Sequence, residues 1–418
     1  MLIDNQGVPP APPEERLAAF FQPIVALDTR RIAGFEALGR LVDGDSVRSL
    51  GPFFSDPRVP VAEQLRIDRL LREQAIAKAG AAPDPPTIFL NLKPSWIHRH
   101  YRATGELHTL SLLGRYNIDP RKICIEITEE EFGGSASELS EVIKLYRDQG
   151  CQIAIDDIGS GFSSYDRIAQ IQPNVLKIDI HLMKKSAYHS GYLGVLRSFS
   201  TLAEQIGASL LIEGVETRED LQRAIHVGAR YVQGYLFAPA EPSFREKDAF
   251  AALIERELHE HRRLLQQSER EWHDRGMALA RSALAAGVGV RLEAIEASGT
   301  SGEDANAASE HADEAIGAWL PRLDETCLRV YLCGRNGIQL SSNHTRHASG
   351  GWNREEDYRG SDWNWRPYFI PHLLEAEGQT PEMKVSPKYA DLDTHAWIRT
   401  ISIPVGRELV LFLDIADR

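Results

Sequence analysis

Acidic and polar side chains recur at the ends of short apolar runs between residues 20 and 237. The set comprises Glu36, Asn91, Glu126, Asp156, Asp157, Lys177, Glu213 and Gln233. Carboxylate and amide oxygens are the ligands that Mg²⁺, Mn²⁺ and Ca²⁺ prefer, whereas zinc favours His and Cys. Five carboxylates gathered in one pocket would raise one another's pKa values, and bound divalent cations remove that penalty. These residue types indicate a divalent-cation site if the fold brings them together.

The adjacent pair Asp156-Asp157 is suited to bridging two cations, because one carboxylate can contact both. Two neighbouring cations lower the pKa of an attacking water and stabilise both oxygens of an in-line phosphoryl displacement. Lys177 is a candidate for orienting that water or for stabilising the charge of the phosphorane. Each acid alone has an ordinary alternative as a surface residue or helix cap. Because the acids stand on successive apolar runs, the set as a whole predicts a metal-dependent phosphoryl hydrolase.

Short β-type runs alternate with helical stretches between these residues, which is typical of a parallel α/β sheet. The expected strands are residues 21–27, 88–92, 123–128, 152–158, 175–180, 209–215 and 231–237. A (β/α)8 barrel places its catalytic residues at the carboxyl ends of its strands, as this set requires. A TIM-like barrel is therefore favoured over an open doubly wound sheet. The absence of GxGxxG and GxxxxGK[ST] argues against Rossmann or P-loop nucleotide binding.

The chain has 418 residues, 47 Lys and Arg against 60 Asp and Glu, and a formal net charge of −13. This balance argues against partners such as DNA, RNA or anionic membranes, and against a two-metal hydrolase of long nucleic acids. The four cysteines form no CxxC pair, so buried or free thiols in a reducing compartment are expected. With no apolar run of membrane-spanning length and no leader pattern, we expect a cytoplasmic protein.

From about residue 243 the pattern changes to apolar residues at helical spacing amid dense charge. This stretch is either a helix packed on the barrel or a long connecting helix that also self-associates. From residue 326 the chain becomes β-rich, with strands expected at 328–333, 397–404 and 408–414. We therefore expect a tail at 1–16, a barrel at 17–245, a long helical linker at 246–322 and an α+β domain at 323–418.

A series of motifs in the first domain resembles that of the EAL-domain cyclic-di-GMP phosphodiesterases. The EALxR signature stands at residues 36–40. The other motifs are FQPI at 21–24, NLKP at 91–94, EITE at 126–129, DDIGSGFSS at 156–164, LKID at 176–179, EGVE at 213–216 and QGY at 233–235. The resemblance covers residues 17–245. It implies a TIM-like barrel, and hydrolysis of cyclic di-GMP to linear pGpG.

Carried over by position, the resemblance implies two sites for Mg²⁺ or Mn²⁺, with Ca²⁺ expected to inhibit turnover. The first would be held by Glu36, Asn91, Glu126 and Asp156, and the second by Asp156, Asp157 and Glu213. The implied catalytic residues are Lys177 on the attacking water, Glu213 as base or metal ligand, and Glu36. The implied substrate contacts are Gln22, Leu38, Arg40, Glu216 and Gln233, with Arg40 on a phosphate. Glu129 would anchor the loop at 156–164, which in this family couples homodimerisation to metal binding.

This loop departs from the family pattern at two positions. Ile158 stands where the family has Phe, and Tyr165 stands where Leu follows the two serines. We expect these changes to tune turnover rather than abolish it. The alternative function is a catalytically weak or inactive cyclic-di-GMP receptor. Because every implied ligand position holds a competent oxygen donor, the sequence favours the enzyme.

The C-terminal domain resembles the PAS/Cache-like domain that follows some EAL domains. The resemblance rests on CGRNGIQLS at 333–341, WRPYF at 365–369 and SPKY at 386–389. Arg366, Tyr368, Tyr389 and Asp391 are candidates for a regulatory pocket that takes a small carboxylate or amine. In the alternative interpretation, the aromatic residues are plain core and Arg366 is an internal ion-pair partner. His344 and His347, three residues apart, are expected to be solvated rather than metal-bound.

Overall fold

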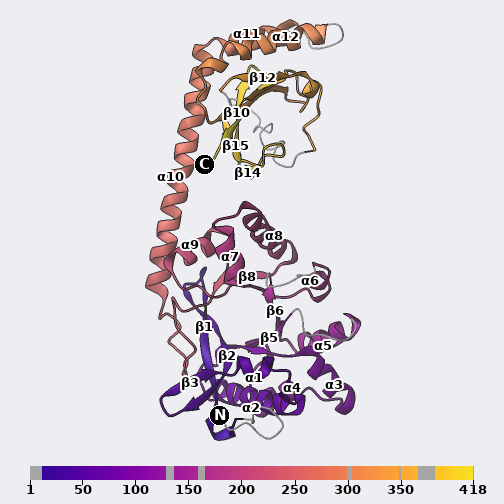
Figure 1. The fold of residues 1–418 in the computed structure, drawn as a ribbon, viewed down its shortest axis with the longest axis vertical. Coiled ribbons are helices and arrows are strands. Elements are labelled where there is room, and N and C mark those ends of the chain that lie inside the picture. Colours follow the sequence, from indigo (N-terminus) through magenta and orange to yellow (C-terminus); the bar gives the residue numbers. More distant parts are fainter. Residues whose placement is uncertain are drawn as a thin grey trace. The chain divides into compact units, whose positions relative to one another are not determined.

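The computed structural model describes residues 12–128, 136–158, 165–298, 304–347, 350–365 and 382–417. The chain divides into two compact units, Met1–Arg262 and Arg263–Arg418, each with its own sheet (Figure 1). Helix α10 (Ala251–Ala285) begins in the first unit and ends in the second. Within the described ranges, no helix combines the length and apolar character needed to cross a bilayer.

Eight strands of the first unit close into a barrel in the order β1-β9-β8-β7-β6-β5-β4-β2, and β2 returns to β1. They are β1 (Leu17–Ala26), β2 (Arg31–Asp43), β4 (Thr87–Asn91), β5 (Ile123–Thr128), β6 (Gln152–Ile158), β7 (Val175–Ile178), β8 (Ser209–Ile212) and β9 (Tyr231–Val232). The short strand β3 (Ser46–Ser49) extends the sheet at β2. The predicted TIM-like barrel is confirmed.

Strand β1 runs antiparallel to both of its neighbours, whereas the pairings from β2 through β9 are parallel. Only residues 27–30 connect β1 to β2. A connection this short makes a hairpin, since a parallel crossover needs a dozen residues or more. Strand β2 is not among the strands expected from the sequence, because Gly34 and Gly39 interrupt its apolar pattern.

Helices surround the barrel, and alternate residues of each strand pack against them. They are α1 (Gly51–Ser55), α2 (Val61–Gly80), α3 (Pro94–Thr104), α4 (His108–Arg115), α5 (Ala136–Asp148), α6 (Tyr165–Ile171), α7 (Ile180–Ser186), α8 (Ser190–Ile206) and α9 (Arg218–His226). In β5, Ile123, Ile125 and Ile127 belong to the large core that includes Leu139 and Val142 of α5. The intervening Cys124 belongs to a separate cluster inside the barrel. All four cysteines are buried thiols.

The interior cluster fixes where the polar residues point. It consists of Ile24, Phe89, Cys124, Ala154, Val175 and Leu211. In five parallel strands the polar residue follows its interior residue by two positions: Asn91 after Phe89, Glu126 after Cys124, Asp156 after Ala154, Lys177 after Val175 and Glu213 after Leu211. Since strand side chains alternate between faces, a two-residue step keeps the same face. The polar set therefore forms the next layer inside the barrel, toward the carboxyl ends of these strands.

The second unit is an antiparallel sheet in the order β12-β11-β10-β16-β15-β13, with β14 also paired to β15. Its strands are β10 (Cys327–Gly334), β11 (Asn343–Arg346), β12 (Trp352–Glu355), β13 (Lys384–Val385), β14 (Tyr389–Ala390), β15 (Trp397–Val405) and β16 (Leu409–Ala416). Helices α11 (Val288–Ser298) and α12 (Asp304–Gly317) share a core with Val330 and Leu332 of β10 and Leu411 and Leu413 of β16. The alternate residues Tyr331 and Phe412 belong to another cluster, on the opposite face.

Asp313 of α12 joins that helix to the sheet through a buried polar network. Its Oδ2 accepts hydrogen bonds from Ser342 Oγ at 2.7 Å and from Arg359 Nη2 at 2.6 Å, and its Oδ1 lies 3.0 Å from His344 Nε2. Burial would raise the pKa of Asp313, but these partners outweigh it and lower the pKa to about 2. The expectation that His344 is solvated is wrong, because it is buried beside Asp313.

Replacing Asp313 by Asn should lower the free energy of unfolding by about 3 kcal/mol, because it removes a buried carboxylate that bonds Arg359 and Ser342. The wild-type contribution should be fully present above the ordinary Asp pKa of 3.8 and be lost as the pH falls toward about 2. Urea denaturation followed by tryptophan fluorescence measures both effects. Glu314→Gln, at the exposed neighbouring position, is the matched control. Equal stability of the two variants would contradict the prediction.

Candidate active site

Lys177 of β7 lies at the centre of the polar layer and is fully buried. Its Nζ lies 2.8 Å from Glu126 Oε1, 2.8 Å from Glu213 Oε1, 3.2 Å from Asp156 Oδ1 and 3.8 Å from Glu36 Oε2. Burial alone would lower the pKa of Lys177, but the surrounding carboxylates raise it well above its usual value. Lys177 is therefore held as an ammonium ion by carboxylates of β2, β5 and β6 and by Glu213, which follows β8.

The carboxylates of this layer exceed the charge that Lys177 can balance. Burial raises the pKa of Glu126 and of Asp157, and it raises the pKa of Glu213 to about 8. Glu126 is ion-paired with Lys177, yet neither of its oxygens has a hydrogen-bond partner of good geometry among the described residues. Mutually repelling carboxylates, of which Glu126 is fully buried and incompletely bonded, are suited to binding further cations.

Three of these acids already have the spacing of a cation site. Asp156, Asp157 and Glu213 each offer an oxygen, and these oxygens lie within 4.8 Å of one another. A β-bulge between Ile155 and Ile158 places two consecutive acids at this edge, and Asp157 adopts a φ of 59°. Left-handed backbone at a non-glycine residue is strained and is often found at functional sites.

Amide side chains hold Glu36 in place from both sides. Asn91 Nδ2 donates to Glu36 Oε1 at 2.8 Å, and Gln233 Nε2 donates to Glu36 Oε2 at 2.7 Å. Gln233 Nε2 also lies 3.2 Å from Gln22 Oε1, and Gln22 Nε2 donates to the carbonyl of Ala238. The structure thus brings Gln22, Asn91 and Gln233 together with Glu36.

A cavity of about 390 Å³ opens beside the carboxylates. Of the residues expected in the site, it is lined by Leu38, Arg40, Asn91, Asp156 and Asp157. Arg40 Nη1 donates to the carbonyl of Gly39, and burial lowers the pKa of Arg40. The lining also includes Phe54 and Trp96, which the sequence analysis missed. Trp96 lies in the first turn of α3, two residues after the NLKP motif ends, and this position was the available signal that it belongs to the site.

Several predicted residues lie elsewhere or beyond the described ranges. Glu216 is exposed and pairs with Lys184 at 3.2 Å, and it does not line the cavity. Glu129, Arg366 and Tyr368 lie outside the described residues. Tyr389 and Asp391 line a different cavity, in the second unit.

The two positions that depart from the family pattern have different environments. Ile158 is fully buried next to Ile178 of β7. Tyr165 begins α6 with its ring exposed and stacked on Phe199 at 5.8 Å between centroids.

Two domain families match the chain in succession. The EAL domain matches residues 8–240, and the EAL-domain associated signalling protein domain matches residues 300–418. YkuI of Bacillus subtilis, an EAL-domain containing protein, is 31% identical over 402 residues, covering 95% of this chain and 93% of YkuI. The cyclic di-GMP phosphodiesterase RocR of Pseudomonas aeruginosa is 33% identical over 232 residues, covering 54% of this chain and 57% of RocR.

Solved structures agree with these matches. The structure of B. subtilis YkuI with substrate c-di-GMP and calcium superposes with a TM-score of 0.79 at 28% identity, covering 96% of this chain and 97% of YkuI. The c-di-GMP-bound standalone EAL protein of Vibrio cholerae has a TM-score of 0.50 at 27% identity, covering 56% of this chain and 97% of that protein. With the EAL match spanning more than half of its length, this chain belongs to the EAL-domain family.

Proposed function

We propose that this chain is a metal-dependent cyclic-di-GMP phosphodiesterase that releases linear pGpG. The observation that carries the proposal is the buried ammonium of Lys177 within a layer of carboxylates, beside a cavity lined by Arg40. The phosphodiesterase activity in the name of RocR and the c-di-GMP bound to YkuI support it. An acidic layer that repels a phosphodiester becomes a substrate site only with added cations.

The donor set fits two divalent cations, because it consists of oxygen ligands with surplus negative charge. Glu36, Asn91, Glu126 and Asp156 would hold one, and Asp156, Asp157 and Glu213 the other. Bound there, Mg²⁺ or Mn²⁺ supplies a water of low pKa and neutralises the phosphoryl oxygens. Ca²⁺, which binds with looser geometry, is proposed to support substrate binding and inhibit turnover.

The side chains of the chain itself orient the reactants. The hydrogen bonds from Asn91 and Gln233 fix the direction of the Glu36 carboxylate. Lys177, unable to lose its proton, can donate to an attacking water and stabilise charge that develops on the phosphoryl group. Glu213 Oε1, 2.8 Å from Lys177 Nζ, is placed to accept the proton of that water once bound cations keep the carboxylate ionised. Water then adds to phosphorus, one P–O3′ bond breaks, and the leaving oxygen takes up a proton.

The cavity walls supply groups for the rest of the nucleotide. Arg40 is proposed to bind a phosphate, with Leu38, Gln22 and Gln233 contacting the substrate. Phe54 and Trp96 offer aromatic faces on which a guanine base can stack.

We also propose that the chain forms a homodimer in the cytoplasm. The C-terminal domain at 323–418 would regulate the barrel through the helical linker at 246–322. Glu216 would reach substrate only if its surface pair with Lys184 opens.

The second candidate function is a cyclic-di-GMP receptor without turnover. Its supporting observation is the altered loop, where Ile158 and Tyr165 replace the usual residues beside the proposed second cation site. A receptor would bind cyclic di-GMP and leave it intact.

The purified full chain should convert cyclic di-GMP to pGpG with Mg²⁺ or Mn²⁺, and chelation by EDTA should abolish turnover because the carboxylate layer then repels the substrate. Chromatographic quantification of pGpG measures turnover, and calorimetry measures binding. With Ca²⁺ we expect binding without product. Binding without product in all three metals would support the receptor, and absence of binding would reject both functions.

Lys177→Met should lower kcat roughly 10²–10³-fold, because it removes a buried donor from the reacting phosphoryl group. It should also lower the melting temperature in EDTA, since Glu126 and Glu213 lose their 2.8 Å ion pairs, and Mn²⁺ should recover part of that loss. The matched control is Lys144→Met, which removes an exposed lysine paired with Asp148. A fall in activity no larger than the fall in folded fraction would assign Lys177 a structural role only.

Arg40→Ala should raise KM for cyclic di-GMP roughly tenfold or more, because a charge-assisted contact to phosphate is lost. The change in kcat should be smaller, since the contact is made in the ground state as well. Steady-state kinetics measure the split between the two constants. Arg115→Ala removes an exposed arginine paired with Glu73 and serves as control. An unchanged KM in Arg40→Ala would exclude Arg40 from substrate binding.

A further inference from the structure

The second unit contains a cavity of about 260 Å³ on the face of its sheet opposite α11 and α12. Aromatic side chains and carboxylates make up most of its lining: Tyr331, Tyr358, Trp363, Trp365, Tyr389, Asp391, Asp393 and Asp414. Arg329, Asn343 and Leu392 complete the described lining. The volume lies slightly below the range of drug-sized pockets, so the cavity suits a small molecule.

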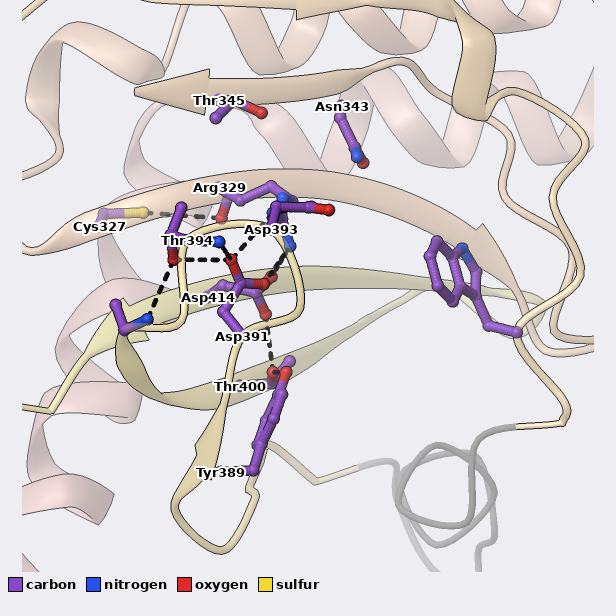
Figure 2. A network of polar contacts seen from close by, with 12 residues as sticks. Cys327, Arg329, Asn343, Thr345, Tyr389, Asp391, Asp393, Thr394, Thr400 and Asp414 are labelled. Atoms are coloured by element: carbon purple, nitrogen blue, oxygen red, sulfur yellow. Dashed lines mark hydrogen bonds and ion pairs between the residues drawn. The ribbon is translucent and has the colours of Figure 1, made fainter. Parts of the chain in front are cut away.

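Among the described residues that line this cavity, negative charges outnumber positive ones. Arg329 Nη1 lies 3.0 Å from Asp391 Oδ1 and 3.0 Å from Asp414 Oδ2, and Nη2 lies 2.8 Å from Asp393 Oδ2. Figure 2 shows these four side chains converging, with Tyr389 below them. Three carboxylates thus surround one guanidinium, and two of them, Asp391 and Asp414, are buried. The surplus negative charge favours a cation and disfavours an anion.

The carboxylates are already fixed in position, which makes the site preorganised. Thr394 Oγ1 donates to Asp391 Oδ2 at 2.7 Å, and Thr400 Oγ1 donates to Asp414 Oδ1 at 2.7 Å. Burial raises the pKa of Asp414, and a second positive charge nearby would favour its ionised form. Among the described residues, the group of three acids with the spacing of a metal site lies in the barrel and not here.

The aromatic walls select for an organic cation over a bare ion. Tyr358 and Trp363 are stacked with centroids 6.5 Å apart, and Trp363 Nε1 donates to Gln339 Oε1 at 2.8 Å, which holds the indole ring. Tyr331 lies 6.3 Å from Trp363 and stacks on Phe412. Aromatic faces attract ammonium groups through their quadrupoles and also bury apolar surface.

We propose that this cavity binds a small organic ammonium compound, with the ammonium group beside Asp393, Asp391 and Asp414 and the apolar body against the aromatic walls. Of the carboxylate and amine ligands that the sequence left open for this domain, the cavity selects the amine. Arg329 does not recruit an anion, because Asp391, Asp393 and Asp414 already pair with it. The inference is independent of the proposed activity of the barrel.

Calorimetry and thermal shift on the full chain test the proposal with cationic, anionic and neutral probes. Phenethylamine, choline and putrescine are the cations, 3-phenylpropanoate is the anion, and 3-phenyl-1-propanol is the neutral compound. We expect at least one cation to bind at millimolar concentration or below and to raise the melting temperature. The anion and the neutral compound should not bind measurably. The affinity should fall as salt is added, because the attraction is electrostatic.

Two variants at exposed positions localise the binding without removing a buried ion pair. Asp393→Asn removes one carboxylate, and Trp365→Ala removes an aromatic ring that is 66% exposed. Each should weaken cation binding about tenfold, whereas Glu408→Gln, an exposed acid outside the cavity, should leave it unchanged. The proposal is overturned if no cation binds, if the anion binds equally well, or if both cavity variants bind like the wild type.

Discussion

The buried ammonium of Lys177 is the interaction on which the first unit depends. A buried lysine keeps its charge only when opposite charges surround it, and here they come from β2, β5, β6 and the residue that follows β8. Strands β6 and β8 are the direct neighbours of β7, whereas β2 lies four strands away in either direction around the sheet. Closure of the barrel is what brings Glu36 of β2 within 3.8 Å of the same nitrogen.

The sequence predicted much of this arrangement because each strand carries its own local signal. An apolar interior residue followed two positions later by a polar one, as in Cys124 and Glu126 or Val175 and Lys177, is visible without any structure. Strand β2 escaped notice because Gly34 occupies the corresponding interior position. A Cβ there would lie 2.7 Å from the carbonyl oxygen of Thr87, so an apolar side chain does not fit.

The features that the sequence did not predict are long-range pairings between residues without a motif. Asp313 and His344 are 31 positions apart, and neither stands in a pattern that indicates a buried partner. Arg329 likewise contacts Asp391 and Asp414 across the sheet, through the register of β10 with β16 and a turn after β14. Such contacts follow from which strands pair, and composition or periodicity carries no information about that.

In both units, carboxylates surround a single cationic side chain. The carboxylate oxygens that are still able to bind a ligand nevertheless indicate different ligands in the two units. In the barrel, Glu126 Oε1 pairs with Lys177, whereas Glu126 Oε2 has no hydrogen-bond donor among the described residues, so a metal ion can coordinate Oε2 without displacing a neighbour. In the second unit, Thr394 and Thr400 donate to the buried acids, and a metal ion would have to break those bonds. The surplus negative charge of this cavity instead attracts a cation that lies against the aromatic rings. Such rings are poor ligands for hard metal ions and good surfaces for organic cations. The same excess of acid thus supports the proposed inorganic cations in one unit and the proposed ammonium compound in the other.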